Sequence, residues 1–208
     1  MPEADTPTRS TEEIMNPIIR IPTIAFLGFA VGCVPPAAPD IDDPTVRESL
    51  FSEMEAVFAE TGGMIEHTRT VHQHAVDIHE GEGGDATIVE ASAIFHDIGI
   101  PKAREVHGSS SGQYQEIEGP PIAREILVRL GFSAEQVDQI CGIIANHHSD
   151  QDPEIVNTLE FKILWDADWL VNFPGRNREK TAAEKEEAIE EIFKTESGRL
   201  LARQMFLE

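Results

Sequence analysis

The sequence has few cysteines, few basic residues and no long apolar run. Its 208 residues include two cysteines, Cys33 and Cys141, too few for a disulfide scaffold or an all-thiolate zinc site. The 16 lysines and arginines are outnumbered by 38 aspartates and glutamates, which gives a formal charge of −22. Such a chain repels nucleic-acid phosphate, so we expect no non-specific binding to DNA or RNA. Because no uncharged run is long enough to span a bilayer, we expect no transmembrane segment.

An uncharged segment near the start of the chain bears on its cellular location. Residues 21–34 read IPTIAFLGFAVGCV, and the Gly32–Cys33 pair is similar to the end of a lipoprotein signal. The stretch before it is rich in acidic residues, whereas secretory signals need a positively charged N-terminal region. We therefore expect a cytoplasmic protein in which residues 1–42 form an arm packed on the domain. The alternative is an exported lipoprotein anchored through Cys33.

Beyond residue 42 the pattern is that of an all-α protein. Apolar residues recur at helical spacing, and typical end signals flank them, such as the Asp43–Pro44 start and the Ser133/Gln136 capping box. The predicted helices cover about residues 44–61, 64–80, 85–99, 119–131, 133–148 and 155–172, with one or two more within 182–207. Residues 100–118 are expected to form a long irregular connection, and connections of this length in compact domains are often functional.

Several histidines and aspartates fall on the apolar faces of these predicted helices. His67 lies one turn before Val71, and His96 follows Val89 and Ala93 at helical spacing. The complete set is His67, His96, Asp97, His147, His148 and Asp168, with Asp166 on a neighbouring apolar face. Each histidine taken alone is more often a hydrogen-bonded core residue, and a lone aspartate is more often a helix-end or salt-bridge residue. His72 lies off the His67 face, and we expect it to be solvated.

The set as a whole indicates a metal site. A buried carboxylate without a partner is costly, so a cluster of carboxylates on inward faces needs a cation. Imidazole and carboxylate together suit a first-row divalent metal better than calcium or a metal that prefers thiolates.

The order of these residues resembles a known family. His67, the His96–Asp97 pair in FHDIG and Asp168 in WDADWL are similar to the H…HD…D signature of the HD-domain metal-dependent phosphohydrolases. The resemblance covers about residues 45–175 and implies a compact helical bundle with a metal at its centre. It predicts an HD-type core over 43–175, extended by C-terminal helices over 176–208. It also implies that His67, His96, Asp97 and Asp168 hold one divalent ion, such as Mn, Fe, Co, Ni or Mg.

One departure from the family pattern concerns a second metal. Family members with two metals have a further histidine between the HD pair and the double histidine His147–His148. The matching stretch, YQEIEGPPIAREIL, contains no histidine and offers Gln115, Glu116 or Glu118 instead. We therefore expect one tightly bound ion, with a second held weakly if at all. The GYP motif of the cyclic-dinucleotide branch is absent, so we do not predict hydrolysis of cyclic di-GMP.

The expected function is hydrolysis of a nucleotide or another small phosphoester. Asp97 would orient or deprotonate the attacking water, and His147 or His148 would protonate the leaving oxygen. Lys102, Glu118 and the Gly/Ser run over 108–112 are the expected substrate contacts. Two alternatives remain: a di-iron oxygenase on the same scaffold, and a non-catalytic, metal-stabilised helical module that binds a ligand. The sequence predicts no oligomeric state.

Overall fold

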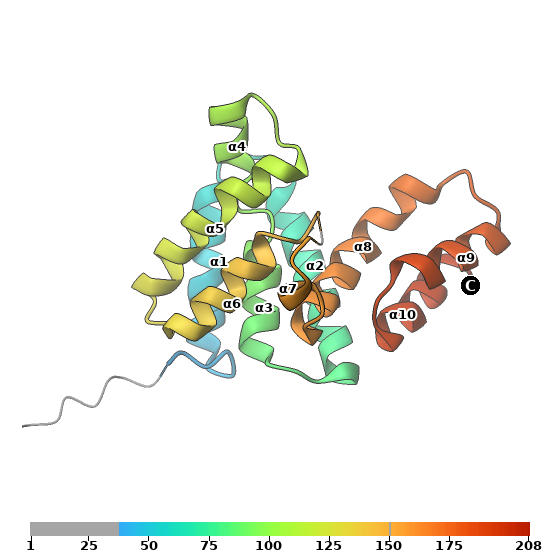
Figure 1. Cartoon of the computed structure of the whole chain (residues 1–208), viewed down its shortest axis with the longest axis horizontal. Helices are drawn as coiled ribbons and strands as arrows, with labels where there is room; N and C mark the ends of the chain where they lie inside the picture. Colours follow the sequence, from blue (N-terminus) through green and yellow to red (C-terminus); the bar gives the residue numbers. More distant parts are fainter. Residues whose placement is uncertain (1–37, 150) are drawn as a thin grey trace, which may run out of the picture. The chain divides into compact units, whose positions relative to one another are not determined.

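The described residues of the computed structural model, 38–149 and 151–208, form an all-helical domain (Figure 1). No β-strand occurs within these ranges. The helices are α1 (Pro44–Phe58), α2 (Met64–Glu82), α3 (Ala86–Phe95), α4 (Ile100–His107), α5 (Gly112–Arg129), α6 (Ala134–Ile144), α7 (Pro153–Val156), α8 (Leu159–Asn177), α9 (Ala182–Ile192) and α10 (Glu196–Phe206). None of these helices combines the length and hydrophobicity needed to cross a bilayer. Residues 1–37 of the predicted N-terminal arm, Cys33 among them, lie outside the described residues.

Several helix starts are fixed by the capping residues that the sequence predicts. The Asp43 side chain accepts a hydrogen bond of 2.9 Å from the Thr45 amide, and Pro44 occupies the first helical position of α1. Ser133 and Gln136 form the predicted capping box at the start of α6. The prediction of an all-α bundle with C-terminal helices is confirmed.

Helix α3 lies at the centre of the domain. It packs against α1, α2, α6 and α8, and every residue from Thr87 to Phe95 is buried. A helix that is surrounded on all sides is mostly apolar, which explains why α3 has no solvent-facing polar stripe and why its one charged residue, Glu90, has bonded partners. The turn after α3 carries the His96–Asp97 pair, so this pair emerges in the middle of the bundle.

The segment predicted as an irregular connection is largely helical, and that prediction is wrong. It contains α4 and the first two turns of α5, which continue through Pro120 and Pro121. The Gly–Pro–Pro run suggested a helix start, because proline cannot donate to the preceding turn. Tertiary packing overrides this signal: a Cβ on Gly99 would lie 2.6 Å from the Gln115 carbonyl oxygen and from the Gly119 amide nitrogen. Two facing glycines thus bring α5 close to the His96–Asp97 turn.

Helix α8 also runs beyond its predicted end at residue 172. It passes through Pro174 and reaches Asn177, whose side-chain amide donates to the Phe173 carbonyl at 3.0 Å. Phe173 and Asn177 are both buried, so packing holds the last turn although Pro174 lacks an amide hydrogen. The longer helix places Arg176 on the same element as Asp168.

A buried polar cluster joins α1, α2 and α3, and it overturns the expectation that His72 is solvated. His72 is only 8% exposed, and its Nε2 lies 2.8 Å from Glu90 Oε2. Arg47 donates two further bonds to the same carboxylate, at 2.6 and 2.8 Å. Burial raises the pKa of Glu90, but the bonds from His72 and Arg47 lower it to about 2. The prediction fails because α2 is covered on two faces, and α1 covers the face that carries His72.

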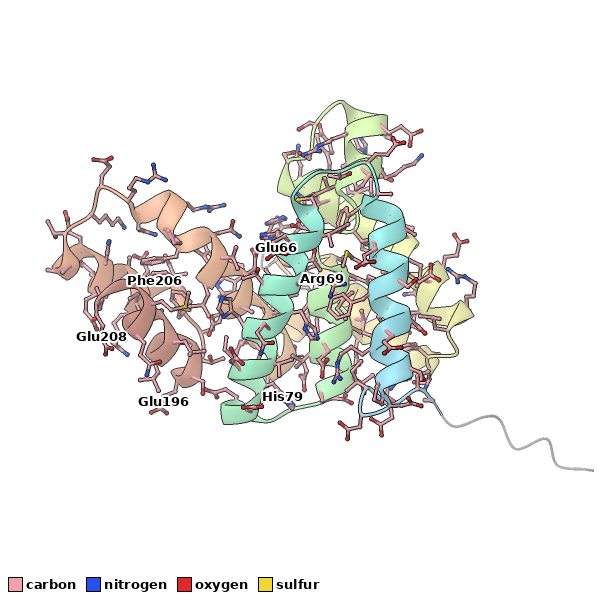
Figure 2. The ribbon with its side chains drawn as sticks, turned by 180° about the vertical axis from the view of Figure 1, so that it is seen from behind. Glu66, Arg69, His79, Glu196, Phe206 and Glu208 are labelled. Carbon is pink, nitrogen blue, oxygen red and sulfur yellow. The ribbon has the colours of Figure 1, made fainter. Side chains whose placement is uncertain are left out.

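The C-terminal helices α9 and α10 pack on α8, and α10 also packs on α2 (Figure 2). Asp166 of α8 joins them to the core: its carboxylate accepts bonds from the Lys194 amide at 2.7 Å and the Thr195 amide at 2.8 Å. Burial raises the pKa of Asp166 to about 6, although these bonds lower it. Asp166 therefore secures the C-terminal helices, whereas Asp168 points to the other side of α8.

Candidate metal centre

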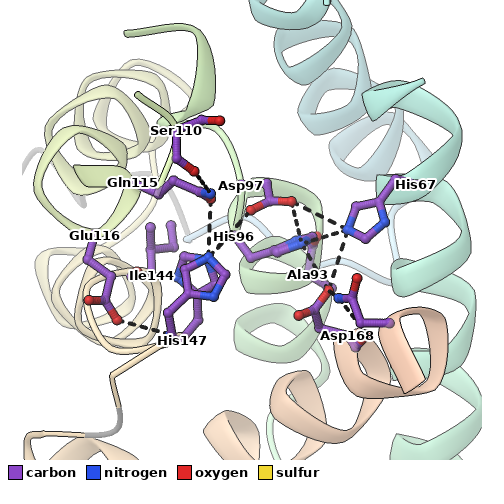
Figure 3. A network of polar contacts seen from close by, with 12 residues as sticks. His67, Ala93, His96, Asp97, Ser110, Gln115, Glu116, Ile144, His147 and Asp168 are labelled. Atoms are coloured by element: carbon purple, nitrogen blue, oxygen red, sulfur yellow. Dashed lines mark hydrogen bonds and ion pairs between the residues drawn. The ribbon is translucent and has the colours of Figure 1, made fainter. Parts of the chain in front are cut away.

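Four segments bring the predicted ligands to one place in the bundle (Figure 3). His67 lies in the first turn of α2, and Asp168 lies in the middle of α8. The other four are in turns: His96 and Asp97 follow α3, and His147 and His148 follow α6. Turns allow adjacent side chains to face the same point, which a regular helix does not.

The first group consists of His67, His96, Asp97 and Asp168. The Nε2 atoms of His67 and His96 are 3.3 Å apart. Asp97 Oδ2 is 3.4 Å from His67 Nε2 and 3.3 Å from His96 Nε2. Asp168 Oδ1 is 3.4 and 3.7 Å from the same two nitrogens. Ligating atoms about 2.0–2.1 Å from a metal lie roughly 2.8–3.4 Å apart in octahedral or tetrahedral geometry. The separations here are at or just above the upper end of that range, so small side-chain shifts would close this donor set on a single divalent ion.

Backbone hydrogen bonds orient two of the imidazole rings. His96 Nδ1 lies 2.8 Å from the Ala93 carbonyl oxygen, and His147 Nδ1 lies 2.7 Å from that of Ile144. Since a carbonyl only accepts, both Nδ1 atoms donate, and the lone pair of each neutral ring is on Nε2. His147 Nε2 is buried without a hydrogen-bond partner among the described residues. Both rings therefore present a metal-ligating nitrogen to the centre of the cluster.

A second group shares Asp97 with the first. Asp97 Oδ1, the oxygen that does not face His67, is 3.6 Å from His147 Nε2 and 3.9 Å from His148 Nε2. These three residues form a possible second ligand set beside the first. Asp97 thus lies between the two groups, with one oxygen toward each.

Electrostatics favour a charged cluster that a cation would neutralise. Burial raises the pKa of Asp97, but His96 and His147 are among the neighbours that hold it well below its usual range. The pKa of Asp168 is also lowered, because His67 and His96 outweigh burial. Burial lowers the pKa of His67, yet Asp168 and Asp97 raise it to about 9. Both carboxylates are therefore anionic at neutral pH.

Gln115 and Glu116 occupy the region where the family pattern predicts a further histidine. Gln115 donates from Nε2 to the Ser110 carbonyl at 2.8 Å, so its Oε1 faces His148 Nε2, 3.2 Å away. Glu116 Oε1 accepts from the amides of His148 and Ser149 at 2.9 and 2.8 Å. Both side chains thus position the second histidine. Burial, with His147 beside it, lowers the pKa of His148 to about 4.

Two predicted substrate contacts lie away from the cluster. Lys102 pairs with Glu105 at 2.9 Å on the exposed side of α4. Glu118 accepts from His107 Nε2 at 2.8 Å, and the His107 ring stacks on Tyr114. Neither Lys102 nor Glu118 lines the cavity beside the cluster. The structure therefore gives no support to their predicted role in substrate binding.

A cavity of about 420 Å³ opens beside the second group. Its lining residues are Ser110, Gly112, Gln115, His147, His148, Trp165, Asp168, Trp169, Asn172 and Arg176. Ser110 and Gly112 belong to the predicted Gly/Ser run. Sequence reasoning missed the contribution of α8 beyond Asp168, although spacings of four and eight residues from Asp168 put Asn172 and Arg176 on its face.

Asn172 supports Asp168, the candidate metal ligand on the same helix. Its side-chain amide donates to Asp168 Oδ1 at 2.8 Å and to the Asp168 carbonyl at 3.1 Å. The same Oδ1 atom faces His67 and His96. Asn172 therefore fixes the orientation of this carboxylate, as residues behind metal ligands commonly do.

Comparison with known proteins gives a consistent result. A family model described as HD domain matches residues 64–173, more than half of the chain. A crystal structure of a predicted HD superfamily hydrolase from an uncultured Thermotogales bacterium has a similar fold, with a TM-score of 0.59 and 23% sequence identity. The alignment covers 77% of this chain and 84% of that one. No curated protein matches the sequence. All six residues of the two ligand groups lie within the matched range.

Proposed function

The chain belongs to the HD-domain family, and we propose that it is a divalent-metal-dependent phosphohydrolase that acts on a nucleotide or another small phosphoester. The observation that carries this proposal is the first ligand group. Two imidazole nitrogens and two carboxylate oxygens face one point, with separations of 3.3 Å between His67 and His96 and 3.7 Å between His96 and Asp168. We propose His67, His96, Asp97 and Asp168 as the ligands.

The residues around the proposed metal have distinct tasks. A divalent ion held by His67, His96, Asp97 and Asp168 would supply Lewis acidity, lowering the pKa of water and polarising a phosphoryl oxygen. Asp97 Oδ1 faces the second group and orients the attacking water. His148 Nε2 donates to Gln115 Oε1 in this structure, and His148 lines the cavity, so with no second ion bound it is the proposed donor to the leaving oxygen once the substrate replaces Gln115 as its acceptor. His147 Nε2, the ring nitrogen that carries the lone pair, is the proposed hydrogen-bond acceptor from the attacking water when no second ion is bound.

The shared Asp97 also supports a second ion, which the di-iron alternative requires. Its ligands would be Asp97, His147 and His148. Gln115 replaces a histidine there, and Glu116 is used in bonds to the His148 and Ser149 amides. With fewer ligands, a second ion should be held more weakly than the first. This difference favours a hydrolase with one firmly bound ion over an oxygenase with a permanent iron pair.

Metal analysis and a substrate screen together test the proposal. We expect protein purified without chelator to keep close to one divalent metal per chain after dialysis. It should hydrolyse at least one member of a panel of nucleotides and small phosphoesters with Mn, Co, Ni or Mg. Two retained irons with the EPR signal of a coupled pair would support the oxygenase instead. One retained metal without hydrolysis of any phosphoester would support a non-catalytic module.

A further inference from the structure

Arg176 is a cation in the cavity wall for which the family match provides no role. It lies on α8, three residues beyond the end of the matched range at residue 173. Its guanidinium lies 4.7 Å from the centroid of the Trp169 ring, and it lines the same cavity as His147, His148 and Asp168. No carboxylate forms an ion pair with Arg176 in the described part of the chain.

Helix geometry determines where the Arg176 charge points. Asp168, Asn172 and Arg176 are spaced by four residues and form one row along α8. The Arg176 backbone lies about 12 Å along the axis from that of Asp168, at 1.5 Å per residue. Helical side chains lean toward the N-terminus, and the contact with Trp169, seven residues earlier, shows that Arg176 does so. The guanidinium is therefore directed along the wall toward the metal ligands.

This separation suits a second anionic group on the substrate. The Arg176 backbone lies two helical turns beyond that of Asp168, and no ion pair joins these two side chains, so the guanidinium is separate from the Asp168 carboxylate and is available to an anionic group other than the reacting phosphate. A small molecule with anionic groups at both ends would bridge the two positions.

Arg176 supplies the local cation that an anionic ligand needs in this acidic chain. The chain carries a formal charge of −22, which repels anionic ligands in general. Among the described residues that line the cavity, Arg176 is the one permanent cation. A guanidinium stacked on an indole ring has its plane fixed, and its N–H groups remain directed outward for paired bonds to phosphate or carboxylate.

The wall behind Arg176 is itself held in place. Trp165 Nε1 donates to the Ile192 carbonyl at 3.1 Å, and Lys194 Nζ lies 4.3 Å from the Trp165 ring centroid. Trp165 and Trp169 are neighbours, with ring centroids 6.3 Å apart. The C-terminal helices thus support Trp165, and Trp165 adjoins Trp169, the ring on which Arg176 stacks.

We propose that Arg176 binds a second anionic group, a phosphate or a carboxylate, on the substrate, and that the protein selects small phosphoesters with two anionic ends. This proposal rests on the proposed function, because it takes the other end of the substrate to react at the metal ligands. It assigns to Arg176 a role in substrate specificity and none in the chemical step.

Binding of unreactive phosphonates tests the proposal without turnover. Metal-loaded protein is titrated by calorimetry with phosphonocarboxylates of two to five methylene groups and with alkylphosphonates of equal length. We expect at least one phosphonocarboxylate to bind about tenfold more tightly than the alkylphosphonate of equal length, which lacks the carboxylate, and this is the effect of one charged hydrogen-bonded pair. Arg176→Gln should abolish this preference and leave alkylphosphonate binding unchanged, while Arg176→Lys should keep part of it. Arg178→Gln, the same change two residues away and outside this cavity, is the control.

The possible outcomes separate this proposal from the proposed function. Equal binding of the two series by the wild-type protein, no binding of either, or an unchanged preference in Arg176→Gln would overturn the role of Arg176. Hydrolysis of 3-phosphoglycerate and glycerol 3-phosphate is then compared. If neither is cleaved although the phosphonate preference is present, the role of Arg176 stands and the hydrolase proposal is in question. If both are cleaved with the same KM in wild type and Arg176→Gln, the hydrolase stands and the specificity role fails.

Discussion

Asn172 provides a direct test of how the proposed metal ligand Asp168 is held. Its amide donates to Asp168 Oδ1 at 2.8 Å, and this oxygen faces both His67 and His96. Asn172→Ala removes this hydrogen bond and leaves every proposed ligand in place. Loss of a hydrogen bond behind a metal ligand typically weakens metal binding by about 10- to 100-fold. We expect the same range here.

The expected loss can be converted into a change in thermal stability. At a metal concentration of 100 times the wild-type Kd, binding stabilises the native state by about 2.7 kcal/mol. Binding weakened tenfold leaves about 1.4 kcal/mol at the same concentration, and binding weakened 100-fold leaves about 0.4 kcal/mol. For a domain of this size, 1 kcal/mol changes Tm by roughly 2–4 °C. The wild-type shift of about 5–11 °C should therefore fall to about 1–6 °C in the variant.

The assay is a thermal melt of metal-free protein with increasing Mn or Ni, and calorimetry supplies the wild-type Kd. Asn157→Ala is a matched control. The Asn157 side-chain amide also donates to the carbonyl four residues earlier, that of Pro153 at 2.8 Å, but it lies at the exposed end of α7. Its metal-induced shift should equal that of the wild type. A metal-induced shift in Asn172→Ala equal to that of the wild type would refute the role of Asn172 in positioning Asp168. The absence of any metal-induced shift in the wild type would refute the metal site itself.

Four further changes test other parts of the structure. Asp97→Ala removes the carboxylate shared by both ligand groups, so we expect loss of hydrolysis and less retained metal, with an unchanged far-UV circular dichroism spectrum. Retained turnover would contradict the proposed role of Asp97. His72→Ala removes a buried donor to Glu90, and denaturant unfolding should show a loss of about 1–3 kcal/mol without loss of metal. The pKa of Glu90 is lowered from 4.5 to about 2 in the native state, so the contribution of its carboxylate to stability is complete above pH 4.5 and is lost as the pH falls toward 2. Glu90→Gln should flatten this acid dependence in melts between pH 2 and 6, and an unchanged dependence would contradict the contribution of Glu90. Gly112→Ala introduces a Cβ that would lie 2.8 Å from the His148 ring, and turnover should fall roughly 10- to 100-fold while retained metal stays at the wild-type level.

The positions of the proposed ligands were accessible from the sequence because helix periodicity is a strong local signal. His67 and Asp168 share faces with apolar residues of their own helices, so their inward direction follows from spacing alone. Buried polar side chains on several such faces were enough to predict where these helices meet. The structure places all six of these side chains in two adjoining groups.

Other features depend on contacts between segments that are distant in the chain. The helical start of α5 depends on the close approach of Gly99 to Gly119, which the local proline signal contradicts. The burial of His72 depends on α1 covering a second face of α2. The role of Arg176 in the cavity wall required knowing that α8 continues through Pro174. In each case a local preference is overridden by tertiary packing.

The connection between α9 and α10 also has consequences for motion. It supplies the Lys194 and Thr195 amides to Asp166, and the last residue of α9, Ile192, accepts a bond from Trp165 through its carbonyl. If this tail detaches transiently as one cooperative unit, a buried carboxylate loses its partners and an indole ring in the cavity wall is released in the same event. The ligand groups make none of these contacts, so the ion would stay bound while the wall loosens. Detachment of the tail would therefore act on the cavity wall and leave the two ligand groups without a lost contact.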